Sequence, residues 1–115
     1  MIKVERLETG RVTVLRFEGD MDEEGMSTVR LALLKCFQDQ RYHVVLNLDA
    51  VAYVSYMGVG VLVERLRQFR ACGGDLKLTG LNLYTRRLLR MVGVHKVFDV
   101  FESEPQAIQT YRTAA

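Results

Sequence analysis

Residues 43–48, with the sequence HVVLNL, decide the class of fold. Val44, Val45, Leu46 and Leu48 make this stretch apolar at nearly every position, rather than at every second one. A short strand without alternation is typical of the centre of a sheet that is covered on both faces. The stretch therefore predicts an inner strand of an α/β domain.

Apolar residues recur at helical spacing on both sides of this strand. In residues 22–38 they are Met26, Val29, Leu33 and Phe37. In residues 57–72 they are Val59, Leu62, Val63, Leu66 and Phe69. Gly73-Gly74 then ends the second helix as a glycine C-cap does. A helix before and after a buried strand predicts parallel strands joined by right-handed crossovers.

The remaining segments complete one α/β domain over residues 1–115. Alternating patterns at 2–7 and 12–17 predict an opening hairpin, and residues 76–78 a further short strand. Asn82 caps a helix that runs to about Met91, with Leu88, Leu89 and Met91 as its apolar residues. Residues 97–101 form a last strand, and a capping box at 103–106 opens a terminal helix. The expected order is β-β-α-β-α-β-α-β-α, a mixed sheet of four to five strands with about four helices.

Composition narrows the classes of function. The net charge of +2 over 115 residues argues against a nucleic-acid partner. No apolar run is long enough to insert into a membrane, and residues 1–8 lack the apolar core of a signal peptide, so we expect a cytoplasmic protein. Cys36 and Cys72 lie in apolar helical patterns and are expected to be buried free thiols. With His43 and His95 they are too scattered for a metal site, and no cofactor is expected.

Several local strings, in this order, resemble the STAS family (sulfate transporter and anti-sigma factor antagonist domains). Residues 17–22 (FEGDMD) are similar to the family's Gly-acid-hydrophobic-Asp turn, and residues 45–49 (VLNLD) to its central strand. Residues 58–60 (GVG) match the Gly-Leu-Gly that opens its second helix. Residues 73–76 (GGDL) and 88–101, with Gly93 at their centre, continue the likeness over nearly the whole chain.

The resemblance implies a regulatory protein of the type that antagonises anti-sigma factors. Regulated members carry Asp-Ser-Ser/Thr-Gly-Leu-Gly, in which the first serine is phosphorylated. Counting back from Gly58, that Asp falls on Ser55, the phosphorylated serine on Tyr56 and the next residue on Met57. We therefore expect either no phosphorylation or phosphorylation at Ser55, with Tyr56 as the other phosphoacceptor candidate. As a purely structural alternative, Ser55 is the N-cap of the helix.

The residues themselves also place a functional site at loop 49–57 and the start of the helix 57–72. Ligands and partners gather at the carboxyl ends of strands in α/β sheets, and a helix N-terminus attracts anions. On the helical wheel Met57 and Val61 lie opposite the core-facing residues, as an exposed apolar pair. Gly58 and Gly60 are expected to permit close approach of the helix to the sheet, or of a partner's backbone. The predicted partner-binding residues are Asp20, Ser55, Tyr56, Met57, Gly58, Val61 and Glu64. Asp20 itself is typical of a turn or a cap, and it is included because the resemblance to the STAS family implies that its loop lies near the partner-binding edge.

The first functional hypothesis is a binding module that docks onto an anti-sigma factor or a histidine-kinase-like ATPase and so frees a sigma factor. The alternatives are a STAS subunit that binds the ATPase of a lipid-transport ATP-binding-cassette complex, and a scaffold of a stress-sensing complex. An enzyme is not expected, because phosphate-cradling, nucleophile-elbow and metal-cluster motifs are missing from the sequence. Whether the protein forms a homodimer stays open.

Overall fold

The computed structural model describes residues 1–113 and has the predicted order of elements. The elements are β1 (Ile2–Thr9), β2 (Val12–Gly19), α1 (Gly25–Gln38), β3 (His43–Ala50), α2 (Tyr56–Ala71), β4 (Asp75–Thr79), α3 (Leu83–Val92), β5 (Val100–Phe101) and α4 (Glu104–Thr113). They form one five-stranded mixed sheet, as expected from the sequence. None of the helices in residues 1–113 is long and apolar enough to cross a membrane.

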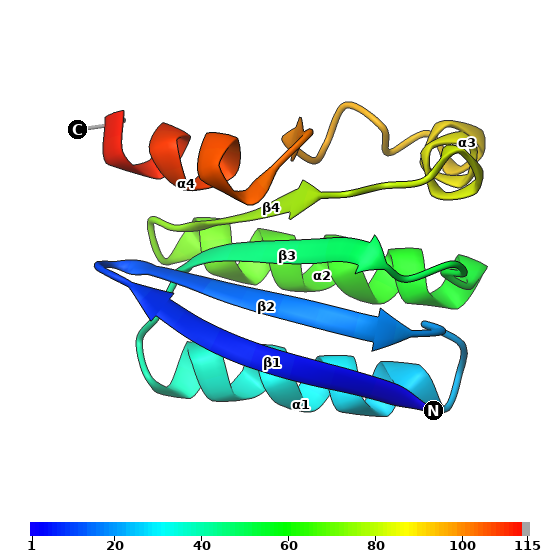
Figure 1. Cartoon of the computed structure of the whole chain (residues 1–115), viewed down its shortest axis with the longest axis horizontal. Coiled ribbons are helices and arrows are strands. Elements are labelled where there is room, and N and C mark those ends of the chain that lie inside the picture. The colour runs from blue at the N-terminus through cyan, green and yellow to red at the C-terminus, as the bar shows by residue number, and fades with distance from the viewer. Residues whose placement is uncertain (114–115) are drawn as a thin grey trace.

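The strands lie in the spatial order β1-β2-β3-β4-β5, with β1 antiparallel to β2 and all later neighbours parallel. In Figure 1, α1 and α2 cover one face of the sheet, and α4 covers the other. The central strand β3 contributes buried side chains to both faces of the sheet. Val44, Leu46 and Leu48 belong to the large core under α1 and α2, whereas Val45 belongs to a smaller core under α4. This division explains why residues 43–48 are apolar without alternation.

Polar contacts fix α4 on its face of the sheet. Arg16 on β2 donates two hydrogen bonds to Glu104 in the first turn of α4, at 2.8 and 2.9 Å, and Asn47 on β3 donates a third. At the other end of α4, the Tyr111 hydroxyl donates to the backbone carbonyl of Val44 at 2.7 Å. A bidentate arginine–carboxylate pair is a specific contact, so α4 is held at both ends.

Two element boundaries differ clearly from expectation. α1 begins at Gly25 rather than Asp22, because the Asp22 carboxylate accepts a hydrogen bond from the Gly25 N–H at 2.7 Å and so precedes the helix. β5 contains only Val100 and Phe101. Phe98, predicted in that strand, is buried in the core from the loop before it.

Two residues expected in the core, Met91 and Cys72, are exposed instead. Met91, expected among the apolar residues that pack α3, is 83% exposed. Both cysteines are free, but only Cys36 is buried, whereas Cys72 is exposed because it lies at the C-cap of α2, where the helix leaves the core.

Candidate functional site

The loop between β3 and α2 is held in place by the turn that follows β2. The backbone N–H of Met21 donates to the carbonyl of Tyr53 at 2.8 Å, and the N–H of Ser55 donates to the carbonyl of Met21 at 2.9 Å. These bonds form an isolated parallel bridge between Met21 and Val54, both of which are fully buried. The loop thus extends the sheet beyond its last regular pair and presents its remaining residues on a rigid base.

Ser55 is the N-cap of α2, as the structural alternative predicted. Its backbone is extended (φ −74°, ψ 159°), and its hydroxyl oxygen accepts a hydrogen bond from the Gly58 N–H at 2.9 Å. This bond satisfies one of the free N–H groups of the first turn. The first turn of α2 carries no acidic side chain to offset the positive end of the helix dipole. The two residues after the cap point outward, with Tyr56 73% and Met57 44% exposed.

Gly58 and Gly60 differ in their surroundings. A Cβ atom on Gly58 would lie 3.1 Å from the Ser55 hydroxyl oxygen and 3.2 Å from the sulfur of Met26 on α1. Gly58 therefore lets α2 pack closely against α1 and the Ser55 cap, and a side chain here would press on both neighbours. A Cβ atom on Gly60 would meet nothing within 4 Å. The expectation that Gly60 allows close packing within the chain is wrong, and the alternative, that it permits close approach of a partner's backbone, stays a prediction.

The other predicted site residues are divided between the surface and the core. Asp20 is exposed directly before Met21, at the same end of the sheet as Ser55. Glu64 is exposed on α2, 3.9 Å from the neighbouring guanidinium of Arg65. Val61 does not form an exposed pair with Met57, because it is half-buried and packs against the main core.

Two tyrosines that were not singled out from the sequence complete this end of the molecule. Tyr53, in the loop after β3, stacks on Tyr84, in the first turn of α3, with ring centroids 5.9 Å apart and an interplanar angle of 27°. Both rings stay substantially exposed, at 40% and 49%, and Leu83 beside them is 61% exposed. The amino-acid pattern contained one usable signal. Both loops follow adjacent parallel strands, whose carboxyl ends meet at one edge.

Asn82 joins these two loops. Its side-chain oxygen accepts from the Thr85 N–H at 2.8 Å, which caps α3 as predicted, while its amide nitrogen donates to the carbonyl of Ala52 at 3.0 Å. The starts of α2 and α3 therefore lie together at one end of the sheet, at the right of Figure 1. We call this the carboxyl-end surface, and its exposed large side chains are Tyr53, Tyr56, Met57, Leu83 and Tyr84.

The carboxyl-end surface has the composition of a protein–protein interface. Tyrosine and methionine side chains, surrounded by polar groups, are enriched where proteins bind one another. Over residues 1–113, no group of three or more His, Cys, Asp or Glu side chains is arranged to hold a metal ion.

Comparison with known proteins agrees with this architecture. The family model of the STAS domain matches residues 3–107. An anti-sigma F factor antagonist from Paenibacillus polymyxa is 26% identical over 98 residues, which are 84% of each chain. Among solved structures, an anti-sigma factor antagonist from Mycobacterium paratuberculosis has a TM-score of 0.87 at 20% identity, covering 97% of this chain and 95% of that one. The phosphorylated form of SpoIIAA, a cell fate determinant from Bacillus, has a TM-score of 0.73 at 21% identity, covering 97% and 100%. Because the family model spans most of the sequence, and the fold agrees with it, the chain belongs to the STAS domain family.

Proposed function

We propose that the protein is an anti-sigma factor antagonist, which binds an anti-sigma factor or a histidine-kinase-like ATPase and thereby frees a sigma factor. Membership of the STAS family and the function named for the Paenibacillus polymyxa relative support this proposal. The contact region is the loop 49–57 together with the start of α2. We assign to it Asp20, Ser55, Tyr56, Met57 and Glu64, and add the exposed Tyr53, Leu83 and Tyr84. Gly58 and Val61, which are buried and half-buried, support this surface from within.

The observation that carries the proposal is the exposed Tyr53–Tyr84 stack on the carboxyl-end surface, which also presents the exposed Met57. Stacking and the Asn82 bridge restrict the two rings before any partner arrives. Restricted aromatic side chains lose little conformational entropy on binding, and tyrosine is enriched among the residues that dominate binding energy. A surface of this kind favours a protein partner over a small substrate.

We further propose that this protein works without the serine phosphorylation of its regulated relatives. Tyr56 occupies the position at which those proteins carry the phosphorylated serine, and its ring projects into solvent. The neighbouring Ser55 hydroxyl is engaged as the helix cap. A kinase that seats a short serine hydroxyl would meet at Tyr56 a hydroxyl several ångströms further from the backbone.

Binding measured by calorimetry tests the first proposal, with the anti-sigma factor kinases of the same genome as ligands. We expect Met57→Asp and Tyr84→Ala to weaken binding at least tenfold, about 1.4 kcal/mol. Leu34→Asp is the matched control, because Leu34 on α1 is 43% exposed, close to the 44% of Met57, but lies away from the carboxyl-end surface. Binding that survives the first two substitutions, or that fails equally with the control, contradicts the assigned surface.

Incubation of the purified protein with such a kinase and ATP tests the second proposal. We expect the intact mass to stay unchanged. A mass gain of one phosphate at Ser55 would show that the switch has moved by one residue, and would overturn the proposal while leaving the binding surface in place. Copurification with a transporter ATPase, or with a multi-protein stress complex, would instead support the alternative STAS roles.

A further inference from the structure

Strand β1 forms a free edge of the sheet. It has eight residues and pairs only with β2, so within residues 1–113 its other side has no strand partner. In Figure 1 it lies at the lower border of the sheet, next to α1. An edge strand presents unpaired N–H and C=O groups and is a template for pairing with another chain.

The hairpin shows which residues present these groups. Thr9 pairs with Val12 across the two-residue turn Gly10-Arg11, and pairing continues in step back to Ile2 with Gly19. Hydrogen-bonded and non-hydrogen-bonded pairs alternate in an antiparallel ladder. The β1 residues whose backbone groups hydrogen-bond to β2 are therefore Lys3, Glu5, Leu7 and Thr9. The even-numbered residues, from Ile2 to Glu8, therefore direct their backbone N–H and C=O groups to the free edge.

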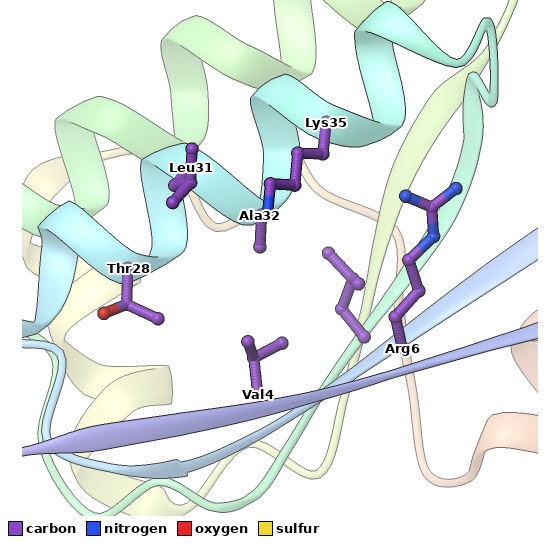
Figure 2. A pocket seen from close by; sticks show the side chains of 7 residues that line it. Val4, Arg6, Thr28, Leu31, Ala32 and Lys35 are labelled. Atoms are coloured by element: carbon purple, nitrogen blue, oxygen red, sulfur yellow. The ribbon is translucent and has the colours of Figure 1, made fainter.

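Beside this edge lies a hollow with an apolar lining. It has a volume of about 230 Å³ and is lined by Val4 and Arg6 of β1 together with Leu31, Ala32 and Lys35 of α1. Figure 2 shows these side chains on the two sides of an open space between strand and helix. Val4 is 38% and Leu31 52% exposed, so the edge combines free backbone groups with apolar side chains.

We propose that this edge binds a second copy of the same chain, with the two β1 strands antiparallel about a two-fold axis at Val4. In this register Val4 faces its own counterpart, while Lys3 of each copy faces Glu5 of the other. The side chains of Lys3 and Glu5 carry opposite charges and are available for this pairing. Within residues 1–113 Lys3 forms no salt bridge, and Glu5 has only the guanidinium of Arg16 at 3.4 Å.

The competing registers are disfavoured by charge. A two-fold axis perpendicular to the sheet keeps each face continuous, so the axis must pass midway between the two copies of one residue. Centring it on Lys3, Glu5, Arg6 or Glu8 would place that residue against an identical charge, which destabilises a cross-strand pair. Charge thus removes four registers. Centring it on Ile2 or Thr9, at the ends of the strand, would pair only a few residues, which leaves the registers centred on Val4 and on Leu7.

The register centred on Leu7 would set Arg6 against Glu8 of the other copy, but both are already engaged within their own chain. Arg6 contacts Glu8 and Asp39, at 2.6 and 2.9 Å, and Glu8 also contacts Arg41. New ion pairs between the two copies would therefore only replace ion pairs that exist within each chain. The Val4 register gives Lys3 new ion pairs without breaking any existing ion pair. It is therefore the register with the most favourable electrostatic energy.

This dimer goes beyond the proposed function and leaves the carboxyl-end surface free. Its ten-stranded sheet would carry two such surfaces at opposite ends, because the two-fold axis reverses the direction of every strand. Each copy could then bind its own partner. Substitutions at Met57 or Tyr84 should therefore leave dimerisation unchanged, which separates this inference from the proposed function.

Charge exchange tests the register. In sedimentation or light-scattering experiments over a concentration series, we expect the wild-type chain to reach twice its mass of 13.2 kDa. Lys3→Glu and Glu5→Lys should each raise the dimer dissociation constant about tenfold, because each creates two like-charged pairs. The double variant exchanges both charges and should return the constant to near the wild-type value.

Amide hydrogen exchange of the wild-type protein gives a second readout that needs no variant. With rising concentration the N–H groups of Val4 and Arg6 should exchange more slowly, while those of Lys3 and Glu5, bonded to β2, should change little. A wild-type chain that remains monomeric at near-millimolar concentration would overturn the proposal. So would a double variant that dimerises as poorly as the single ones, or protection that rises equally at all four amides.

Discussion

The Ser55 hydroxyl oxygen and the Gly58 N–H are joined by a 2.9 Å hydrogen bond that closes the first turn of α2. The same serine donates its own backbone N–H to Met21, so a single residue ties the helix start to the turn after β2. Ser55 therefore contributes to the position of the carboxyl-end surface through both its side chain and its backbone, together with the Met21–Tyr53 bond and the Asn82 side chain.

Removing the Ser55 side chain should destabilise the fold. We expect Ser55→Ala to lower the free energy of unfolding by about 1 kcal/mol, because an N–H of the first turn loses its acceptor. Ser55→Asp should stay near the wild-type value, since a carboxylate accepts the same bond and is favoured at a helix N-terminus. Urea unfolding measures both, with Ser27→Ala on the exposed side of α1 as a control. Equal stability of the alanine variant and the wild type would contradict the capping role.

The two glycines of α2 should respond in opposite directions to alanine. Gly60→Ala should raise the free energy of unfolding by roughly 0.5–1 kcal/mol, because the new methyl group meets open space and alanine favours the helix. Gly58→Ala should lower it, because its methyl group would press on the Ser55 hydroxyl and on Met26. Unfolding curves of the two variants, recorded together, provide the comparison. A gain in stability for Gly58→Ala would show that the cap tolerates displacement.

The two thiols should differ in reactivity. Cys36 is fully buried, and burial raises the pKa of its thiol to about 11, so little thiolate forms near neutral pH. Cys72 is exposed at the end of α2. We expect a thiol reagent to label one cysteine in the native protein and two after unfolding, as counted by intact mass. Cys72→Ser should abolish native labelling, and labelling of Cys36 at a similar rate would contradict its burial.

The fold could be predicted from the sequence because each element carries its own local signal. The apolar run of β3, the helical spacing of α1 and α2, and the Asn82 cap are all properties of a few neighbouring residues. Val61 was misplaced for a physical reason. A helical wheel assigns one core-facing stripe, whereas α2 contacts α1, α3 and β4, so a wider arc of its surface is covered.

The candidate site was only partly predictable. The cap role of Ser55 and the exposure of Met57 could be predicted, because these residues stand before and at the start of a helix. The stack of Tyr53 on Tyr84 joins residues from two loops, and its geometry depends on how β3 and β4 are paired and on the Asn82 side chain that bridges the loops. Periodicity within one segment contains no information about such a contact.

Lowering the pH should weaken the attachment of α4 to the sheet, because the Glu104 carboxylate becomes protonated. Arg16, and then Asn47, hold the pKa of the Glu104 carboxyl below its usual value of 4.5. A carboxylate with a lowered pKa stabilises the folded state fully at a pH above the value of the unfolded chain, and this contribution disappears as the pH falls through the folded value. Glu104→Gln keeps the size of the side chain but removes the charge, so it should lower Tm by a few degrees at neutral pH.

The pH dependence of that difference distinguishes the charge from the packing. Thermal unfolding of wild type and Glu104→Gln, followed from neutral pH into acid, should give Tm values that converge as the pH falls through the lowered pKa of Glu104, where the wild-type carboxyl loses its charge. Glu23→Gln is the matched control, because Glu23 is exposed before α1 and forms no ion pair within residues 1–113. It should leave Tm almost unchanged at every pH. A Glu104→Gln deficit that persists undiminished in acid would mean that the contacts of the side chain with Arg16 and Asn47 owe nothing to its charge.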